Sequence, residues 1–208
     1  MPLAPHDIPV KSYLIGSLLN KASFNLIIGF NQYWAEPTEL LLAIGLTCLA
    51  IQNGKRGLRA LMLFYPAIWL TGSLIGSYLP PILYLSIVTI PGLEIIDKNP
   101  SAILAASVLM TGLLVALGRQ FNLRLYLIFI LVVGLVTGFL HGLLVNGHPN
   151  GIFATLGMLT MLWLTLFIAI FIFSFLSQLR QGIVLRVIGS WIAAAGILVL
   201  GYSIKHNL

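Results

Sequence analysis

The chain has 208 residues, of which 59% are hydrophobic and only 8% are charged. Soluble domains are about half apolar and about a quarter charged, so this composition excludes a soluble globular domain, and a disordered chain with it. The mean hydropathy of +1.04 therefore predicts a protein whose natural solvent is lipid. Cys48 is the single cysteine, which excludes an intramolecular disulfide and a cysteine-based zinc site.

The net charge of +6 comes from 11 Lys and Arg residues against 5 Asp and Glu residues. The basic residues are scattered between long apolar runs instead of being gathered on one stripe. This pattern is typical of the loops of a membrane protein, so the lipid bilayer is the expected partner and nucleic acid is not.

The N-terminal segment, residues 1–37, is apolar overall between residues 12 and 30, but Asn20, Lys21 and Asn25 interrupt that run. A Lys at the centre of the bilayer costs about 2.5–3.5 kcal/mol on insertion scales. The segment is therefore predicted to be interfacial or re-entrant, and a seventh membrane segment is the alternative.

Residues 38–204 contain six apolar runs, and residues 205–208 form a short tail. Crossing a hydrocarbon core of about 30 Å takes about 20 apolar residues, a length that five runs reach while the first is shorter. None of the runs alternates apolar and polar residues, which excludes a β-barrel. The sequence thus predicts an all-α, polytopic membrane helix bundle with six transmembrane helices, at about 38–53, 58–79, 100–118, 123–145, 152–178 and 184–204.

The connection over residues 79–99 is apolar but is interrupted by Pro80, Pro81, Pro91 and Gly92. Proline removes a backbone donor and breaks a helix, and such backbone is tolerated at membrane depth where protein buries it. This connection is predicted to be a broken, partly inserted loop.

The loops after the first, third and fifth spans carry seven basic residues, which alternation places on one side of the membrane. That side is predicted to be cytoplasmic, because cytoplasmic loops carry the excess of Lys and Arg. The seven residues are Lys55, Arg56, Arg59, Arg119, Arg124, Arg180 and Arg186.

The residues that could bind a cation are predicted to gather towards the opposite face. Glu36, Glu39 and Glu94 precede or follow the first two spans on that side, and His141 lies about one turn below the outer end of its span. These four residues form a candidate metal or polar site, because ionisable groups inside the membrane are costly and often functional.

Each of these four residues also has a purely structural interpretation. Glu36 and Glu39 flank Pro37 and suit the positive end of a helix dipole. Glu94 fits a solvated loop, and His141 fits a side chain bonded to a neighbouring helix.

Helix packing is predicted at two pairs of glycines with a four-residue spacing, which lets helices approach closely: Gly72 with Gly76, and Gly134 with Gly138. Tyr33, Tyr78 and Tyr202 lie near span ends, as an aromatic belt would. The sequence contains no catalytic triad order, phosphate loop or haem motif, so an enzyme is not expected.

Four stretches of the sequence carry a more specific pattern. They are Glu39-Leu-Leu-Leu-Ala-Ile-Gly-Leu46, Ser107-Val-Leu-Met-Thr-Gly-Leu-Leu-Val-Ala-Leu117, Gly138-Phe-Leu-His-Gly142 and Arg186-Val-Ile-Gly-Ser-Trp-Ile-Ala-Ala-Ala-Gly-Ile-Leu198. In this order they resemble the HupE/UreJ family of small bacterial membrane proteins. The resemblance covers roughly residues 29–204. It implies a multi-pass protein of the bacterial inner membrane, linked to hydrogenase or urease and regarded in the family as a nickel or cobalt permease.

The departures from the family fall on its metal motifs. The family has His-Pro followed by Gly-x-Asp-His before the first span, where this chain reads Asn31-Gln-Tyr-Trp-Ala-Glu-Pro-Thr-Glu39, and of the histidines in the fourth span only His141 remains. Nickel and cobalt favour imidazole ligands, so these replacements weaken such a site.

Two functions are therefore expected. The first is a degenerate family member that acts as an accessory or structural subunit with other membrane protein subunits. The alternative is a divalent metal permease. No cofactor is expected, and nickel or cobalt enters only if the chain is a permease.

Overall fold

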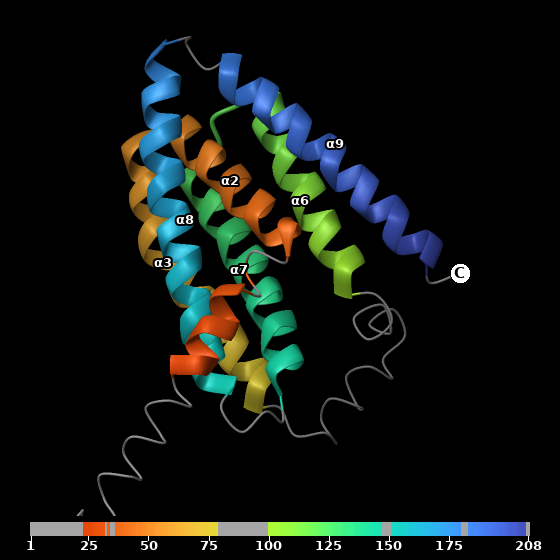
Figure 1. Cartoon of the computed structure of the whole chain (residues 1–208). Coiled ribbons are helices and arrows are strands. Elements are labelled where there is room, and N and C mark those ends of the chain that lie inside the picture. The colour runs from red at the N-terminus through yellow and green to blue at the C-terminus, as the bar shows by residue number, and fades with distance from the viewer. Residues whose placement is uncertain are drawn as a thin grey trace, which may run out of the picture.

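The structure, a computed structural model, describes residues 23–31, 33, 36–78, 100–146, 151–179 and 183–206. Within these ranges the chain is helical apart from short turns, which confirms the predicted all-α membrane bundle (Figure 1). The predicted loop over 79–99 lies outside the described residues. A helix over residues 23–31 precedes six labelled helices: α2 (Pro37–Gln52), α3 (Gly54–Tyr78), α6 (Pro100–Leu117), α7 (Leu123–Val145), α8 (Gly151–Leu179) and α9 (Ile183–His206).

Five of these helices, α3, α6, α7, α8 and α9, are long and apolar enough to cross a membrane. The predicted span over 38–53 is present as α2, a shorter apolar helix of 16 residues. At 1.5 Å per residue α2 is about 24 Å long, compared with a hydrocarbon core of about 30 Å, so a sixth crossing of the membrane stays a prediction.

α2 lies at the centre of the bundle, between two closely packed pairs of helices. The most extensive contacts in the described chain join α3 to α7 and α6 to α9, and α2 contacts α3, α6, α8 and α9. More than half of its residues are buried. The core of the protein is therefore built around this short helix (Figure 1).

Glycines allow α3 and α7 to pack backbone against backbone. A methyl group at Gly138 would collide with the carbonyl of Trp69, and one at Gly142 would collide with the carbonyl of Ser73. A methyl group at Gly72 would also collide, with the carbonyl of Leu135. Without a hydrophobic effect between helices in lipid, this close approach supplies much of the packing energy.

Asn53 ties together the end of the bundle where α2 turns into α3. Its Nδ2 donates to the carbonyl of Leu49 at 2.8 Å, and its Oδ1 accepts from the backbone amide of Phe121 at 3.0 Å. Gln52 Nε2 donates to the carbonyl of Val115 at 2.8 Å. These bonds fix the α2–α3 turn against the connection between α6 and α7.

The helices alternate in direction, so this same end carries the basic loops. We call it the basic end. It carries Lys55 and Arg56 near the start of α3, Arg119 after α6 and Arg124 in the first turn of α7. Arg186 follows near the start of α9, where its side chain lies over Gly118. Arg180 lies outside the described residues.

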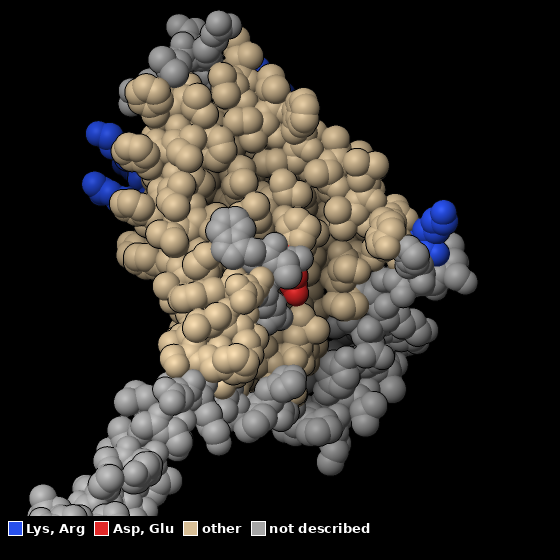
Figure 2. Space-filling model, in the orientation of Figure 1, with Lys and Arg blue, Asp and Glu red and all other residues tan. Residues whose placement is uncertain are grey.

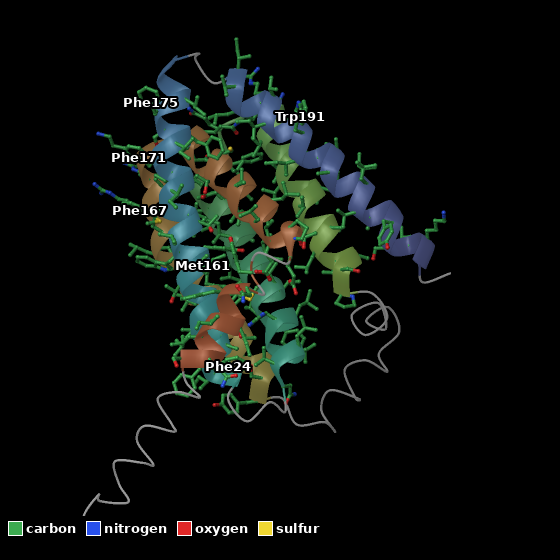
Figure 3. The ribbon with its side chains drawn as sticks, viewed as in Figure 1. Phe24, Met161, Phe167, Phe171, Phe175 and Trp191 are labelled. Carbon is green, nitrogen blue, oxygen red and sulfur yellow. The ribbon has the colours of Figure 1, made fainter. Side chains whose placement is uncertain are left out.

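The outer surface of the bundle is apolar, as lipid contact requires. Phe167, Phe171 and Phe175 follow one another at four-residue intervals along α8, and Trp191 projects from α9 (Figure 3). All four side chains are more than 60% exposed. A chain with this surface and five spanning helices is a multi-pass membrane protein.

Candidate functional site

The polar residues inside the bundle begin with a row on α3. Tyr65, Trp69 and Ser73 are four residues apart, so they lie on one face of the helix, and each is buried. This face is directed at α7, with which α3 makes its most extensive contact. The row therefore runs along the α3–α7 interface instead of facing lipid.

A matching row on α7 is formed by Thr137 and His141, which are also four residues apart and buried. Tyr65 shares a side-chain hydrogen bond with Thr137. One turn further along, the rings of Trp69 and His141 lie 5.0 Å apart between centroids, tilted by 33°. The two rows thus meet at two successive turns of the interface.

Glu39 in the first turn of α2 lies beside these rows. Its side chain is only 4% exposed, and its carboxyl group lies close enough to the hydroxyls of Tyr65 and Tyr33 to interact with them electrostatically. Tyr33 is fully buried and lies beside Thr165 of α8. We call Tyr33, Glu39, Tyr65, Trp69, Ser73, Thr137 and His141 the polar cluster.

The depth of Glu39 differs from the expectation that it lies at the outer face. Tyr65, its neighbour, lies beside the midpoint of α3, so Glu39 lies near the middle of the apolar thickness. The physical reason is the length of α2. Its last residue turns into α3 at the basic end, and its 16 residues reach back only about 24 Å from there.

Several polar atoms of the cluster are buried and have no hydrogen-bond partner among the described residues. They include Oε2 of Glu39 and both ring nitrogens of His141, together with Nε1 of Trp69 and Oγ of Ser73. Each such group costs about 1–3 kcal/mol, and more if it is charged. A bound water or ion is one explanation for such groups, and ionisable groups inside a membrane are candidate functional residues.

The cluster offers one carboxylate and one imidazole as cation ligands: Glu39 interacts with Tyr65, and His141 contacts Trp69 one turn further along α3. Among the residues that the structure describes, no three His, Cys, Asp or Glu side chains come together as a metal site. The expected group of Glu36, Glu39, Glu94 and His141 is therefore not assembled in the described part of the chain. Any cation held here would also need hydroxyl or carbonyl oxygens or water.

Glu36 differs from Glu39 in its surroundings. It is the residue before Pro37 at the start of α2, its side chain makes no capping hydrogen bond, and it is only half-buried. It interacts electrostatically with Glu39. Glu94 lies outside the described residues, so the structure places Glu36, Glu39 and His141 but not the fourth predicted residue.

Most residues of the cluster were not predicted from the sequence. Tyr33 was predicted to belong to an aromatic belt but is fully buried, whereas Tyr78 and Tyr202 are exposed, as belt residues would be. The four-residue spacing of Tyr65, Trp69 and Ser73 was the available signal, because a polar row on an apolar span indicates an inward face.

The predicted packing glycines lie at the same interface. Gly72 and Gly76 approach the backbone of α7, Gly138 approaches the backbone of α3, and Gly134 faces the ring of Tyr65. These close contacts hold the polar rows of α3 and α7 in register.

Comparison with known proteins identifies the family of the chain. A family model described as "HupE / UreJ protein" matches residues 38–199, from the first turn of α2 into α9, and this range contains Glu39 and His141. Neither the curated proteins nor the solved structures contain a match to the chain. The matched region is more than three quarters of the sequence, and the chain belongs to the HupE/UreJ family.

Proposed function

We propose that this chain is a membrane permease for a small divalent cation, which passes through the polar cluster. The single observation that carries the proposal is a pair of buried groups inside the bundle, Oε2 of Glu39 and the ring nitrogens of His141, that have no hydrogen-bond partner among the described residues. A protein that only filled space in a complex would gain stability by replacing them with apolar side chains. Their presence at membrane depth favours a transported ion as the missing partner.

The chemistry of the two groups favours a first-row transition-metal ion as the substrate. Imidazole nitrogen suits nickel and cobalt, whereas a carboxylate oxygen accepts harder ions as well. With one ligand of each kind, the cluster would bind such an ion weakly. Weak binding is compatible with transport, because an ion that binds too tightly leaves slowly.

We also propose that the chain lies in the bacterial inner membrane with its basic end in the cytoplasm. The support is the charge distribution, because every described Lys and Arg except Lys205 lies at the basic end. The basic loops follow the first, third and fifth predicted spans, as the bias of cytoplasmic loops requires. No catalytic role is proposed.

Uptake by purified protein in liposomes tests the permease. Nickel or cobalt entry is followed with a chelating fluorophore inside the vesicles, and saturable flux is expected. Glu39→Gln and His141→Ala should each lower the initial rate at least tenfold. Absence of saturable flux in the unsubstituted protein would refute the permease.

Glu36→Gln is the matched control, because it also removes one negative charge. Glu36 lies three residues before Glu39, is half-buried and is outside the polar cluster. We expect less than a twofold change in rate. Equal losses in Glu36→Gln and Glu39→Gln would contradict the assignment of the site to Glu39.

An accessory subunit is the second candidate, and a different observation favours it. An apolar groove of about 550 Å³ lies between α8 and α9 with α2 at its base, and Trp191 lines it with a side chain that is 77% exposed. A helix of another membrane subunit fits a groove of this kind.

Co-purification in mild detergent tests the accessory subunit. A stoichiometric membrane subunit is expected to be retained by Trp163→Ala, which alters an exposed Trp of α8 outside the groove, and lost from Trp191→Ala. A protein that purifies alone and transports the cation would refute the accessory role.

A further inference from the structure

A second groove lies on the opposite flank of α8, where this helix passes α3. It has a volume of about 450 Å³, and the residues that line it come from α3 (Leu58, Arg59, Met62 and Leu63) and from α8 (Phe167, Ile170 and Phe171). Phe167 and Phe171 form one wall, with side chains that are 62% and 76% exposed. The lining is apolar except for a single charged residue, Arg59, which is itself exposed.

Arg59 lies at the depth of a membrane surface. From Arg59 to the far end of α3 at Tyr78 there are 19 residues, and therefore about 28 Å of helix. From the groove residue Ile170 to the far end of α8 at Gly151 the distance is again about 28 Å. Both helices thus place the groove about one hydrocarbon thickness from their opposite ends, where headgroups begin.

The groove carries positive charge that no described carboxylate neutralises. Lys55 and Arg56 are exposed near the start of α3, one turn before Arg59. Figure 2 shows basic side chains projecting from the flank where Figure 3 labels Phe167 and Phe171. The acids that the structure describes are Glu36 and Glu39, at the start of α2 and far from this end of α3.

An apolar groove that carries one basic side chain, Arg59, fits one class of membrane component. A phospholipid has acyl chains that pack on aromatic and aliphatic side chains, and a phosphate that accepts hydrogen bonds from a guanidinium group. The neighbouring basic residues also attract an anionic headgroup towards this surface, but of these residues only Arg59 lines the groove and can bond the phosphate there. A zwitterionic lipid also fits the groove, but its headgroup is attracted less strongly by these basic side chains.

We propose that the groove between α3 and α8 is a binding site for an anionic phospholipid, with Arg59 holding the headgroup and Phe167 and Phe171 packing on an acyl chain. This site is separate from the polar cluster, because it lies on the outer surface of the bundle. It holds one annular lipid in place at the basic end.

Lipid retention measured by native mass spectrometry tests the site. The protein is purified in detergent, mixed with phosphatidylglycerol, cardiolipin or phosphatidylcholine, and examined for bound lipid. Retention of an anionic lipid is expected to exceed that of phosphatidylcholine at least fivefold. Equal retention of the three lipids would overturn the proposal.

Three variants locate the binding. Arg59→Gln should lower retention of phosphatidylglycerol at least fivefold. Arg56→Gln also removes one positive charge, but Arg56 lies one turn before Arg59 and does not line the groove. Its effect should therefore be less than twofold. Leu63→Trp should also lower retention, because it fills the groove from an exposed position and leaves Arg59 intact.

Equal losses in Arg59→Gln and Arg56→Gln would show diffuse attraction to a basic surface and would overturn the site. Full retention in Leu63→Trp would exclude the groove as the place of the acyl chain. Inorganic phosphate and glycerol phosphate are added as competitors, and displacement by millimolar amounts of either would point to a free phosphate instead of a lipid. Each variant is used only if it elutes as a monodisperse peak, and Leu63→Trp and Arg59→Gln test the site independently.

Discussion

Glu39 is the residue whose surroundings differ most from what its chemistry prefers. Its carboxyl group lies near the middle of the bundle, beside two tyrosine hydroxyls, and Oε2 has no hydrogen-bond partner in the described structure. Transfer of a polar group into an apolar medium without a compensating bond costs about 1–3 kcal/mol in proteins. The fold carries this cost at a position where an apolar residue would pack.

Replacing Glu39 should therefore stabilise the protein while it abolishes transport. Glu39→Met keeps the length of the side chain and removes the unpartnered group, so we expect the free energy of unfolding to rise by about 1–3 kcal/mol. Thermal unfolding in detergent measures the change as a higher Tm.

Thr47→Val is the control for this prediction, because Thr47 is buried on the same helix but its hydroxyl donates to the carbonyl of Ala43 at 2.8 Å. We expect its Tm to stay close to that of the unsubstituted protein. A lower Tm in Glu39→Met would mean that the carboxylate stabilises the fold, which contradicts the assignment to a ligand site.

A second prediction at the scale of one residue concerns the contribution of Asn53 to stability. Its amide links the α2–α3 turn to Phe121, so Asn53→Ala leaves a backbone amide without its acceptor. The expected loss is about 1–2 kcal/mol of stability, visible as a lower Tm. Ser190→Ala removes only an exposed bond within α9, to the carbonyl of Arg186, and an equal loss there would contradict the role of Asn53.

The sequence could predict that Glu39 and His141 are unusual, because an ionisable residue stands out in an apolar run. It could not predict the depth of Glu39, since that depends on where α2 turns into α3 and on the neighbours that the turn selects. The burial of Tyr33 was missed for the same reason. Its position in the chain suggests a boundary, but its side chain lies against α8.

At the scale of helices, the pairing of α3 with α7 determines the site. Tyr65 and Trp69 can meet Thr137 and His141 only because glycines let the two backbones approach. The close packing that stabilises the pair therefore also aligns the polar rows.

Gly138→Ala should separate this pair. The added methyl group would meet the backbone of Trp69, which can yield only if α3 moves, so we expect a loss of about 1–3 kcal/mol in stability. Gly201→Ala is the matched control, since nothing lies within 4 Å of a methyl group there. Thermal unfolding of both variants is the measurement, and an equal Tm would contradict the close packing.

Most of the helices could be predicted, but their partners could not. Apolar runs of about 20 residues determine the spans, and Pro37 and Pro100 begin helices as their fixed φ favours. The sequence does not show which helices are neighbours, because a helix that is apolar on all sides, such as α8, has no polar face to distinguish the side that packs. Only the glycines and the polar rows carry that information.

At the scale of the whole molecule, charge is separated along the membrane normal. Six of the seven predicted cytoplasmic residues lie in the described chain, all near the basic end, while the described acids lie at the start of α2. This separation supports the proposed orientation, and it supports the proposed lipid site because no described carboxylate lies at the basic end.

Reporter fusions test the orientation. A reporter fused after Arg119 is expected in the cytoplasm and one fused after His148 on the opposite side, because α7 separates the two positions. The matched pair serves as its own control, since only one fusion of the two should be active with a reporter that works in the cytoplasm. The reverse pattern would overturn the orientation and the placement of the lipid site in the inner leaflet.

The short length of α2 also subjects Glu39 to the electric field of the membrane. A charge that crosses the whole bilayer gains or loses about 2.3 kcal/mol per 100 mV, so a divalent ion that enters from the far side and stops halfway collects about the same amount. A negative interior would draw a cation towards Glu39 with about this free energy. Occupancy of the polar cluster should consequently depend on voltage, whereas that of the surface groove at Arg59, close to one edge of the field, should not.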